Sequence, residues 1–189
     1  MRKIVKIRDF KKIINSPIFN DWFNITKKII LSHEFQKRKL MKHHDDTVFE
    51  HCILVSFEAY QISLKYDDID SEICAIAGLL HDFYPEAWQY TKSLEKLDES
   101  YRQRFLNNKK LNMHGFVHGK KAMENAYKYY PKIMNKKIAN SIKNHMFPLT
   151  IIPPRYKEGW IITMADKKVT FTNMPKIYNW PKYLGFNFN

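Results

Sequence analysis

The feature that most constrains the fold is the apolar run Ala75–Leu80, which ends abruptly in His81 and Asp82. A helix that is apolar on every side is normally buried in a globular protein. Placing an imidazole and a carboxylate side by side at its end is costly unless something binds them. The stretch therefore predicts a buried helix that presents a polar pair to a ligand, and a metal ion is the first candidate.

Length and composition indicate a globular protein. The chain has 189 residues, of which 44% are apolar and only 5 are glycine, so it is long enough for one domain with a sizeable core. Cys52 and Cys74 lie in apolar stretches, so we expect small core residues rather than a disulfide. The charged N-terminus leaves no apolar segment for a signal peptide, and no stretch approaches the roughly 20 apolar residues that span a bilayer. We expect a cytoplasmic protein without a membrane partner.

The strongly basic charge favours an anionic ligand. The chain has 32 Lys and Arg residues against 19 Asp and Glu residues, a formal net charge of +13. The excess is mostly lysine scattered from Lys3 to Lys182, without an arginine-rich arm or a recognised nucleic-acid-binding motif. We therefore expect an anionic small substrate, and do not expect nucleic acid as the main partner.

Hydrophobic periodicity predicts helices throughout. Apolar residues recur every three or four positions over residues 4–14 and 19–35, which predicts two amphipathic helices that pack on the domain behind them. Thr47 and Glu50 have capping-box spacing, which predicts a helix from Val48. Asp70 or Ser71 can cap the apolar helix. Further helices are predicted over 94–105 and 118–130, after the cap Asn135 with Ile138, Ile142 and His145 on one face, and over 158–171.

The domain organisation follows from these helices. Gly115 and Gly119 are expected to bracket a turn before the helix at 118–130. Nothing in the sequence gives an alternating strand pattern, an internal repeat or a low-complexity linker. The sequence thus predicts an all-α, single-domain bundle with an N-terminal helical segment (1–40), a core (41–171) and a C-terminal tail (172–189).

Six side chains on or beside these apolar stretches can ligate a metal: His51, His81, Asp82, His118, His145 and Asp166. Imidazole nitrogen and carboxylate oxygen suit divalent Zn, Mn, Fe, Co or Ni, and a carboxylate can bridge two ions. Such a centre can convert water into hydroxide near neutral pH and stabilise charge on a phosphoryl oxygen.

Each of these residues also has a simpler explanation. His118 or His145 alone is more often a hydrogen-bonded core or surface histidine, and a helix-terminal salt bridge could explain the pair at 81–82. Asp166 alone could be satisfied by backbone amides or by the two lysines that follow it. The ordered set favours a shared site, because several buried polar groups would otherwise each need a separate explanation.

The ordered pattern His51, His81-Asp82 and Asp166 resembles the HD-domain metal-dependent phosphohydrolases, over roughly residues 41–170. The resemblance implies an all-α HD-type bundle in which these four residues bind one metal ion, with Asp82 at the catalytic centre. Many catalytic members carry a lysine three residues after the aspartate of the His-Asp pair, whereas this chain has Pro85. This departure and the missing Gly-Tyr-Pro signature argue against the cyclic-di-GMP subgroup.

Two further segments, 118–126 and 142–150, are similar to bacterial members that bind a second metal ion. In that subset Asp82 would bridge two ions, with His118 and His145 on the second. His114 competes with His118, which we prefer because it lies at the start of the clearer helix. The resemblance therefore implies two divalent ions, drawn from Mn, Fe, Co, Ni, Zn or Mg.

The leading hypothesis is a metal-dependent phosphohydrolase, a phosphomonoesterase or phosphodiesterase, that acts on a nucleotide or another phosphorylated small molecule. Two alternatives stay open: an HD-type di-iron oxygenase, since the six ligands also suit iron, and a non-catalytic module that binds a nucleotide or nucleic acid. The candidates for orienting the phosphate in place of the missing lysine are Lys120, Lys121, Arg155 and Lys167.

Overall fold

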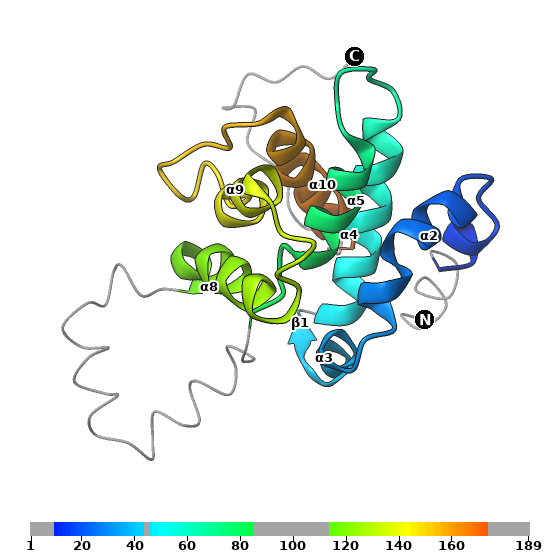
Figure 1. Cartoon of the computed structure of the whole chain (residues 1–189), viewed down its shortest axis with the longest axis horizontal. Helices are drawn as coiled ribbons and strands as arrows, with labels where there is room; N and C mark the ends of the chain where they lie inside the picture. The colour runs from blue at the N-terminus through cyan, green and yellow to red at the C-terminus, as the bar shows by residue number, and fades with distance from the viewer. Residues whose placement is uncertain (1–9, 44–45, 85–113, 174–189) are drawn as a thin grey trace.

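The chain folds into a helical bundle around three central helices. The computed structural model describes residues 10–43, 46–84 and 114–173. In Figure 1, α4 (Val48–Ser63), α5 (Ser71–Leu80) and α10 (Lys157–Asn173) run through the middle of the molecule. On one side lie α2 (Phe19–Ile30) and α3 (His33–Gln36), and on the other lie α8 (His114–Tyr129) and α9 (Lys136–Asn144).

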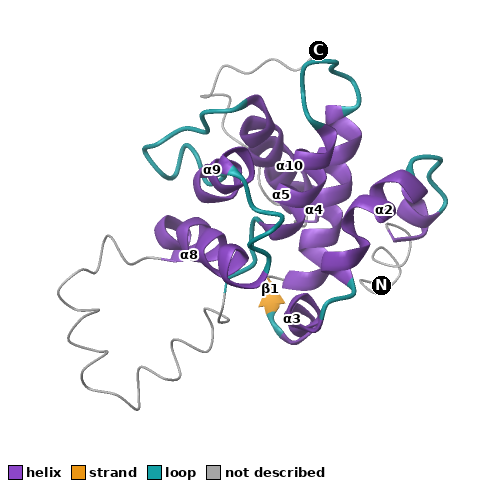
Figure 2. Cartoon of the chain, in the orientation of Figure 1, coloured by secondary structure: helices purple, strands orange, loops and turns teal. Residues whose placement is uncertain are grey.

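The remaining regular structure is short. A 3-10 helix, η1 (Lys37–Leu40), follows α3, and the two-residue strands β1 (Lys42–His43) and β2 (Asp46–Thr47) pair antiparallel before α4. Helices dominate every other part of the chain that the structure describes (Figure 2). The prediction of an all-α protein is therefore confirmed. Within the described residues, no helix is long and apolar enough to cross a membrane.

Local cap chemistry sets the helix starts. The amide of Glu50 donates to Thr47 Oγ1 at 3.2 Å, and the Glu50 carboxylate accepts from the Thr47 amide at 2.9 Å, which is the predicted capping box. Asp70 caps α5 and Asn135 caps α9, each by accepting from the amide three residues later. These caps explain why α4, α5 and α9 begin where the sequence indicates.

A glycine allows α4 and α5 to pack closely. A Cβ atom on Gly78 would lie 2.9 Å from the backbone Cα of Ser56, so only glycine fits at this contact. The Ser56 hydroxyl donates to the Ala75 carbonyl at 2.7 Å across the same contact. Cys52 and Cys74 are buried free thiols, as predicted. The end of α5 is thereby held firmly against α4.

The N-terminal helices pack on this core. The indole of Trp22 in α2 donates to Ser56 Oγ at 2.9 Å and meets the Phe57 ring edge-on at 5.5 Å. Phe35 in α3 is fully buried. Two helices extend the core on the α2 side, which explains the apolar periodicity of residues 19–35.

Several helix boundaries differ from the sequence predictions. The helix predicted over 19–35 ends at Ile30, because Ser32 accepts from the Phe35 amide and starts α3. The turn predicted between Gly115 and Gly119 is wrong, since both lie inside α8, which begins at His114 rather than at 118. The last helix spans 157–173 rather than 158–171. The helix predicted over 94–105 lies outside the described residues.

Gly119 serves a close helix contact instead of a turn. A Cβ atom at this position would lie 2.7 Å from the carbonyl oxygen of Lys143 and 3.0 Å from that of Ile142. Glycine therefore lets α8 approach the last turn of α9. This approach matters for the site, since His118 and His145 flank it.

Candidate metal centre

The structure brings all six predicted ligand side chains together at the centre of the bundle. His51 lies in the first turn of α4 and His118 in the second turn of α8. His81 and His145 are the C-cap residues of α5 and α9. Asp82 follows His81, and Asp166 lies midway along α10. The four histidines and Asp82 are buried, and the Asp166 side chain is 15% exposed.

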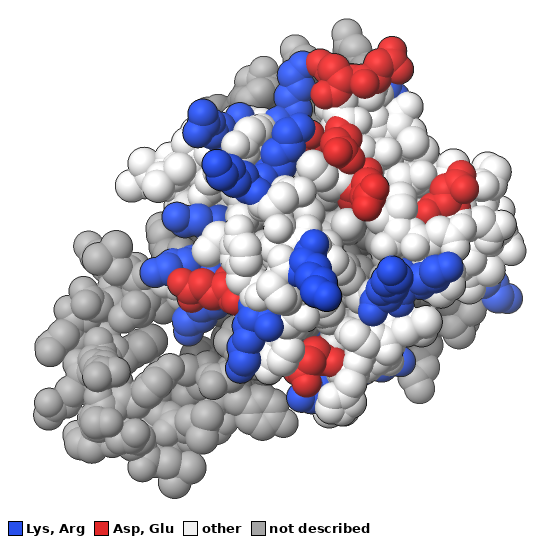
Figure 3. Space-filling model, viewed as in Figure 1, with Lys and Arg blue, Asp and Glu red and all other residues white. Residues whose placement is uncertain are grey.

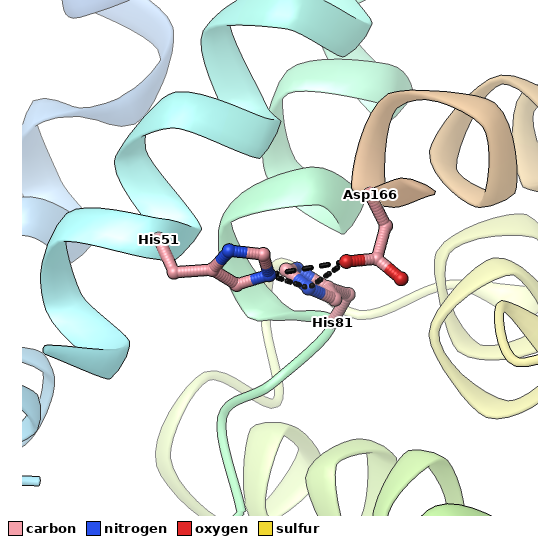
Figure 4. Close-up of side chains that lie close together, drawn as sticks. All are labelled: His51, His81 and Asp166. Carbon is pink, nitrogen blue, oxygen red and sulfur yellow. Dashed lines mark hydrogen bonds and ion pairs between the residues drawn. The ribbon is translucent and has the colours of Figure 1, made fainter. Parts of the chain in front are cut away.

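One group of side chains comprises His51, His81 and Asp166. His51 Nε2 lies 3.1 Å from Asp166 Oδ1 and 3.2 Å from His81 Nε2. His81 Nε2 lies 3.6 Å from the same carboxylate oxygen. Figure 4 shows these three side chains converging from α4, from the end of α5 and from α10. Their ligand atoms all lie within 4.8 Å of one another.

A second group comprises His118 and His145 with Asp82. The two imidazoles meet at 3.0 Å between their Nε2 atoms. Asp82 Oδ1 lies 3.3 Å from His118 Nε2 and 3.8 Å from His145 Nε2. The close contact of α8 with α9 at Gly119 thus places two histidines on one carboxylate oxygen.

Asp82 lies between the two groups. Its Oδ2 atom faces the first group, at 3.7 Å from His81 Nε2 and 4.0 Å from His51 Nε2. Its Oδ1 atom faces the second group. One carboxylate thereby offers one oxygen to each pair of histidines.

Backbone carbonyls orient two of the imidazoles. His81 Nδ1 lies 2.7 Å from the Gly78 carbonyl, and His145 Nδ1 lies 2.7 Å from the Ile142 carbonyl. A carbonyl can only accept, so each Nδ1 carries the hydrogen and donates it. The Nε2 atoms are left to face the cluster, which is the arrangement found in histidines that ligate metals.

The charges of the cluster affect its protonation. Burial by itself lowers the pKa of His81, but the negative charges of Asp82 and Asp166 outweigh it and raise this pKa to about 9. Burial, together with the neighbouring His118 and His81, lowers the pKa of His145 to about 3. Although burial opposes it, hydrogen bonding to His51 and His81 holds the pKa of Asp166 well below its usual range.

The donor set fits a divalent metal. Neutral imidazole and carboxylate are the ligands of divalent transition metals, at about 2.0 to 2.2 Å from the ion for zinc. Ligand atoms that share such an ion lie roughly 3 to 4 Å apart, as the facing atoms do here. Within the described residues, two sets of three have ligand atoms that all lie within 4.8 Å of one another: His51, His81 and Asp166, and His81, Asp82 and His145.

The four predicted phosphate-orienting residues lie in different surroundings. Lys120 and Lys121 are exposed on α8 just after His118, and Lys120 Nζ lies 3.7 Å from Glu124 Oε1. Arg155 is exposed before α10. Lys167 is half-buried and donates to the Phe147 carbonyl at 2.5 Å. On the face in Figure 3, basic side chains gather over α8 and α9, and acidic ones beside the α4 to α5 connection.

The sequence analysis did not predict the contact by which Asn125 holds the backbone next to the cluster. Asn125 Nδ2 in α8 donates to the Phe83 carbonyl at 2.8 Å, directly after the His-Asp pair. In the sequence, the local signal for this contact is a polar residue beside Ala122 and Ala126 on the predicted helix. His114 begins α8, and its side chain lies outside the described part of the structure. Pro85, the departure from the family pattern, also lies outside it.

The described residues form a helical domain with a buried cluster of histidine and aspartate side chains that could hold a metal ion. The family model described as HD domain matches residues 48–169, which is more than half of the chain. The chain therefore belongs to the HD domain family. Comparison with curated proteins and with solved structures gave no match.

Proposed function

We propose that this protein is a metal-dependent phosphohydrolase, a phosphomonoesterase or phosphodiesterase that acts on a nucleotide or another phosphorylated small molecule. The observation that carries the proposal is the position of Asp82, whose two oxygens face separate pairs of histidines. Membership of the HD domain family supports the same reaction class.

In this proposal the six clustered residues hold two divalent ions. His51, His81 and Asp166 would hold the first ion, His118 and His145 would hold the second, and Asp82 would be a ligand of both. When bound, such ions lower the pKa of water and stabilise negative charge on a phosphoryl oxygen. Although burial lowers the pKa of His81, the charges of Asp82 and Asp166 raise it to about 9, so an ion at this imidazole would compete with a proton.

Basic residues of this chain bind the substrate in the proposal. Lys167 follows the ligand Asp166, and the hydrogen bond to the Phe147 carbonyl fixes its ammonium group. Lys120 and Lys121 lie one turn or less from His118 on an exposed part of α8. Together with Arg155 they supply the positive charge that a phosphate group requires.

The test is hydrolysis by the purified full-length protein loaded separately with Mn, Co, Fe, Zn or Mg. p-Nitrophenyl phosphate reports phosphomonoesterase activity, and bis-p-nitrophenyl phosphate reports phosphodiesterase activity. We expect metal-dependent release of p-nitrophenol from one of them, and a nucleotide panel then narrows the natural substrate.

Asp82→Asn is the variant that tests the proposal, because it keeps the side-chain volume but removes the charge of the carboxylate. We expect it to lower kcat by at least two orders of magnitude, a loss typical of a group that acts on the reacting centre. Equal rates in the variant and the wild type would contradict the proposal. So would oxygen consumption by the iron-loaded protein without phosphoester hydrolysis under any metal.

A further inference from the structure

Phe83 connects the metal cluster to the N-terminal part of the chain. It follows Asp82 directly and is fully buried. Its ring stacks on Phe35 of α3 at 6.2 Å between centroids and lies 5.4 Å from the Tyr130 ring. Its carbonyl is held by Asn125 of α8. The backbone beside Asp82 is thus fixed from two directions.

Arg38 provides the second contact of η1 and α3 with Phe83. Its guanidinium carbon lies 4.5 Å from the centroid of the Phe83 ring, a cation–π stack. Phe35 and Arg38 are three residues apart and so face the same side of the helical turn. Phe83 therefore contacts both the Phe35 ring and the planar Arg38 guanidinium. Both residues lie before the family match at 48–169.

Among the residues that the structure describes, the buried Arg38 guanidinium forms no ion pair. The residue is 3% exposed, and Nη1 donates to the weak acceptor Met41 Sδ at 3.0 Å. Within the described residues, no carboxylate lies at ion-pair distance from Arg38, and no acceptor meets its buried Nε atom. Burial lowers its pKa accordingly.

Stability of the fold does not account for an arginine at this position. A buried and unpaired charge costs several kcal/mol, so an apolar side chain of similar length would stabilise the fold better. A methionine could fill the same volume against Phe83. Unlike methionine, the arginine places a planar, positively charged group on the Phe83 ring, next to Asp82.

We infer that Arg38 is a positioning residue of the metal centre: by stacking on Phe83 it fixes the turn after α5 and so holds the Asp82 carboxylate between the two histidine pairs. The inference rests on the proposed function, because it concerns the ligand that the two proposed ions share. Metal sites require ligand placement within a fraction of an ångström, so loosening this turn weakens binding without removing a ligand.

The test compares Co(II) binding by the full-length wild type and by Arg38→Met, which keeps the side-chain length but removes the planar cation. Affinity is measured by competition with a chelator, and ligand geometry by the visible absorption of bound Co(II). We expect affinity to fall at least tenfold, the scale of loss for residues behind a ligand, with an altered absorption spectrum. For a substrate that the wild type hydrolyses, we expect kcat to fall more than KM rises.

Phe83→Leu tests the same contact from the other side. We expect a similar loss of Co(II) affinity, and a double variant little weaker than either single variant, because both substitutions break one interaction. Lys37→Met is the matched control: Lys37 is an exposed neighbour that pairs with Glu34, so the variant should bind Co(II) as the wild type does. Trp22→Phe removes the bond to Ser56 and should lower thermal stability with the Co(II) spectrum unchanged.

The outcomes separate the inference from the proposed function. If Arg38→Met loses stability but keeps wild-type Co(II) affinity and spectrum, the inference is wrong. A rise in KM with metal binding intact also overturns it, since Arg38 would then contact substrate. If Arg38→Met does not fold, Arg38→Lys decides by the same spectrum, because it keeps the charge but not the planar stack. A wild type that binds no Co(II) contradicts the proposed function instead.

Discussion

Asp82 is the residue on which the two histidine groups depend. Its oxygens divide between them, so replacing it should affect both proposed ions, whereas replacing His118 should affect one. We expect the purified wild type to retain two ions per chain, His118→Ala to retain one, and Asp82→Asn to retain less than one. Metal analysis after gel filtration measures these contents. Two ions retained by Asp82→Asn would show that the carboxylate is not a shared ligand.

The ionisation of Glu158 makes the stability of the fold depend on pH. It is buried at the start of α10, and its carboxylate accepts from Lys137 Nζ of α9 at 2.7 Å. Burial opposes ionisation, but this hydrogen bond outweighs it and lowers the pKa of Glu158 below its usual value. The pair therefore stabilises the fold above the unfolded pKa of about 4.3, and this contribution is lost as pH falls through the lower folded pKa.

Glu158→Gln removes that contribution. We expect the variant to be less stable than the wild type by about 1 kcal/mol at pH 7, and the difference to shrink as the pH falls below about 4. Urea unfolding at several pH values measures it. Lys136→Ala, an exposed neighbour of Lys137, serves as the control and should show no such dependence. A difference that stays constant from pH 7 to pH 3 would contradict the assignment.

The close approach of α8 to α9 brings His118 and His145 together. Gly119→Ala would push a methyl group against the Lys143 carbonyl, where the available distance is only 2.7 Å. We expect a loss of about 1 to 3 kcal/mol in the free energy of unfolding, the usual cost of overpacking. Because His118 moves away from His145, we also expect weaker binding of one of two Co(II) ions.

Stepwise Co(II) titration and urea unfolding check this prediction. Glu124→Ala is the matched control, since it changes an exposed side chain on the same helix. Equal weakening of both Co(II) ions would indicate a general disturbance of the bundle rather than a separation of α8 from α9.

For the whole molecule, we expect metal to stabilise the fold. The six candidate ligands come from five segments, so the two proposed ions together would hold five parts of the bundle. An ion at a hundredfold excess over its Kd adds about 2.7 kcal/mol. For a chain of this size that corresponds to a rise in Tm of about 5 to 10 °C. Thermal unfolding with added Mn or Co, and again with excess chelator, measures the rise, which should be absent from Asp82→Asn.

Local chemistry made part of this structure predictable. Thr47, Asp70 and Asn135 cap helices through contacts three residues away, so their effects can be inferred from the sequence. The apolar body of α5 likewise indicated a buried helix that ends in His81 and Asp82. The clustering of six candidate ligands was expected from their order and from the family resemblance.

Tertiary contacts were not predictable in the same way. Gly119 suggested a turn because glycine has that local meaning, but the structure uses it for contact between helices. Each oxygen of Asp82 faces a different histidine pair, and this arrangement depends on how α4, α5, α8 and α9 pack. Arg38 could not be distinguished from the other basic residues by composition, because its burial arises only when Phe83 is placed beneath it.

The long separation of His51 from Asp166, 115 residues along the chain, has a consequence during synthesis. A nascent polypeptide that ends before α10 already carries the four histidines of the cluster and Asp82. It lacks Asp166, whose carboxylate completes the first group. The complete ligand set of the proposed first ion therefore becomes available only after α10 has been translated.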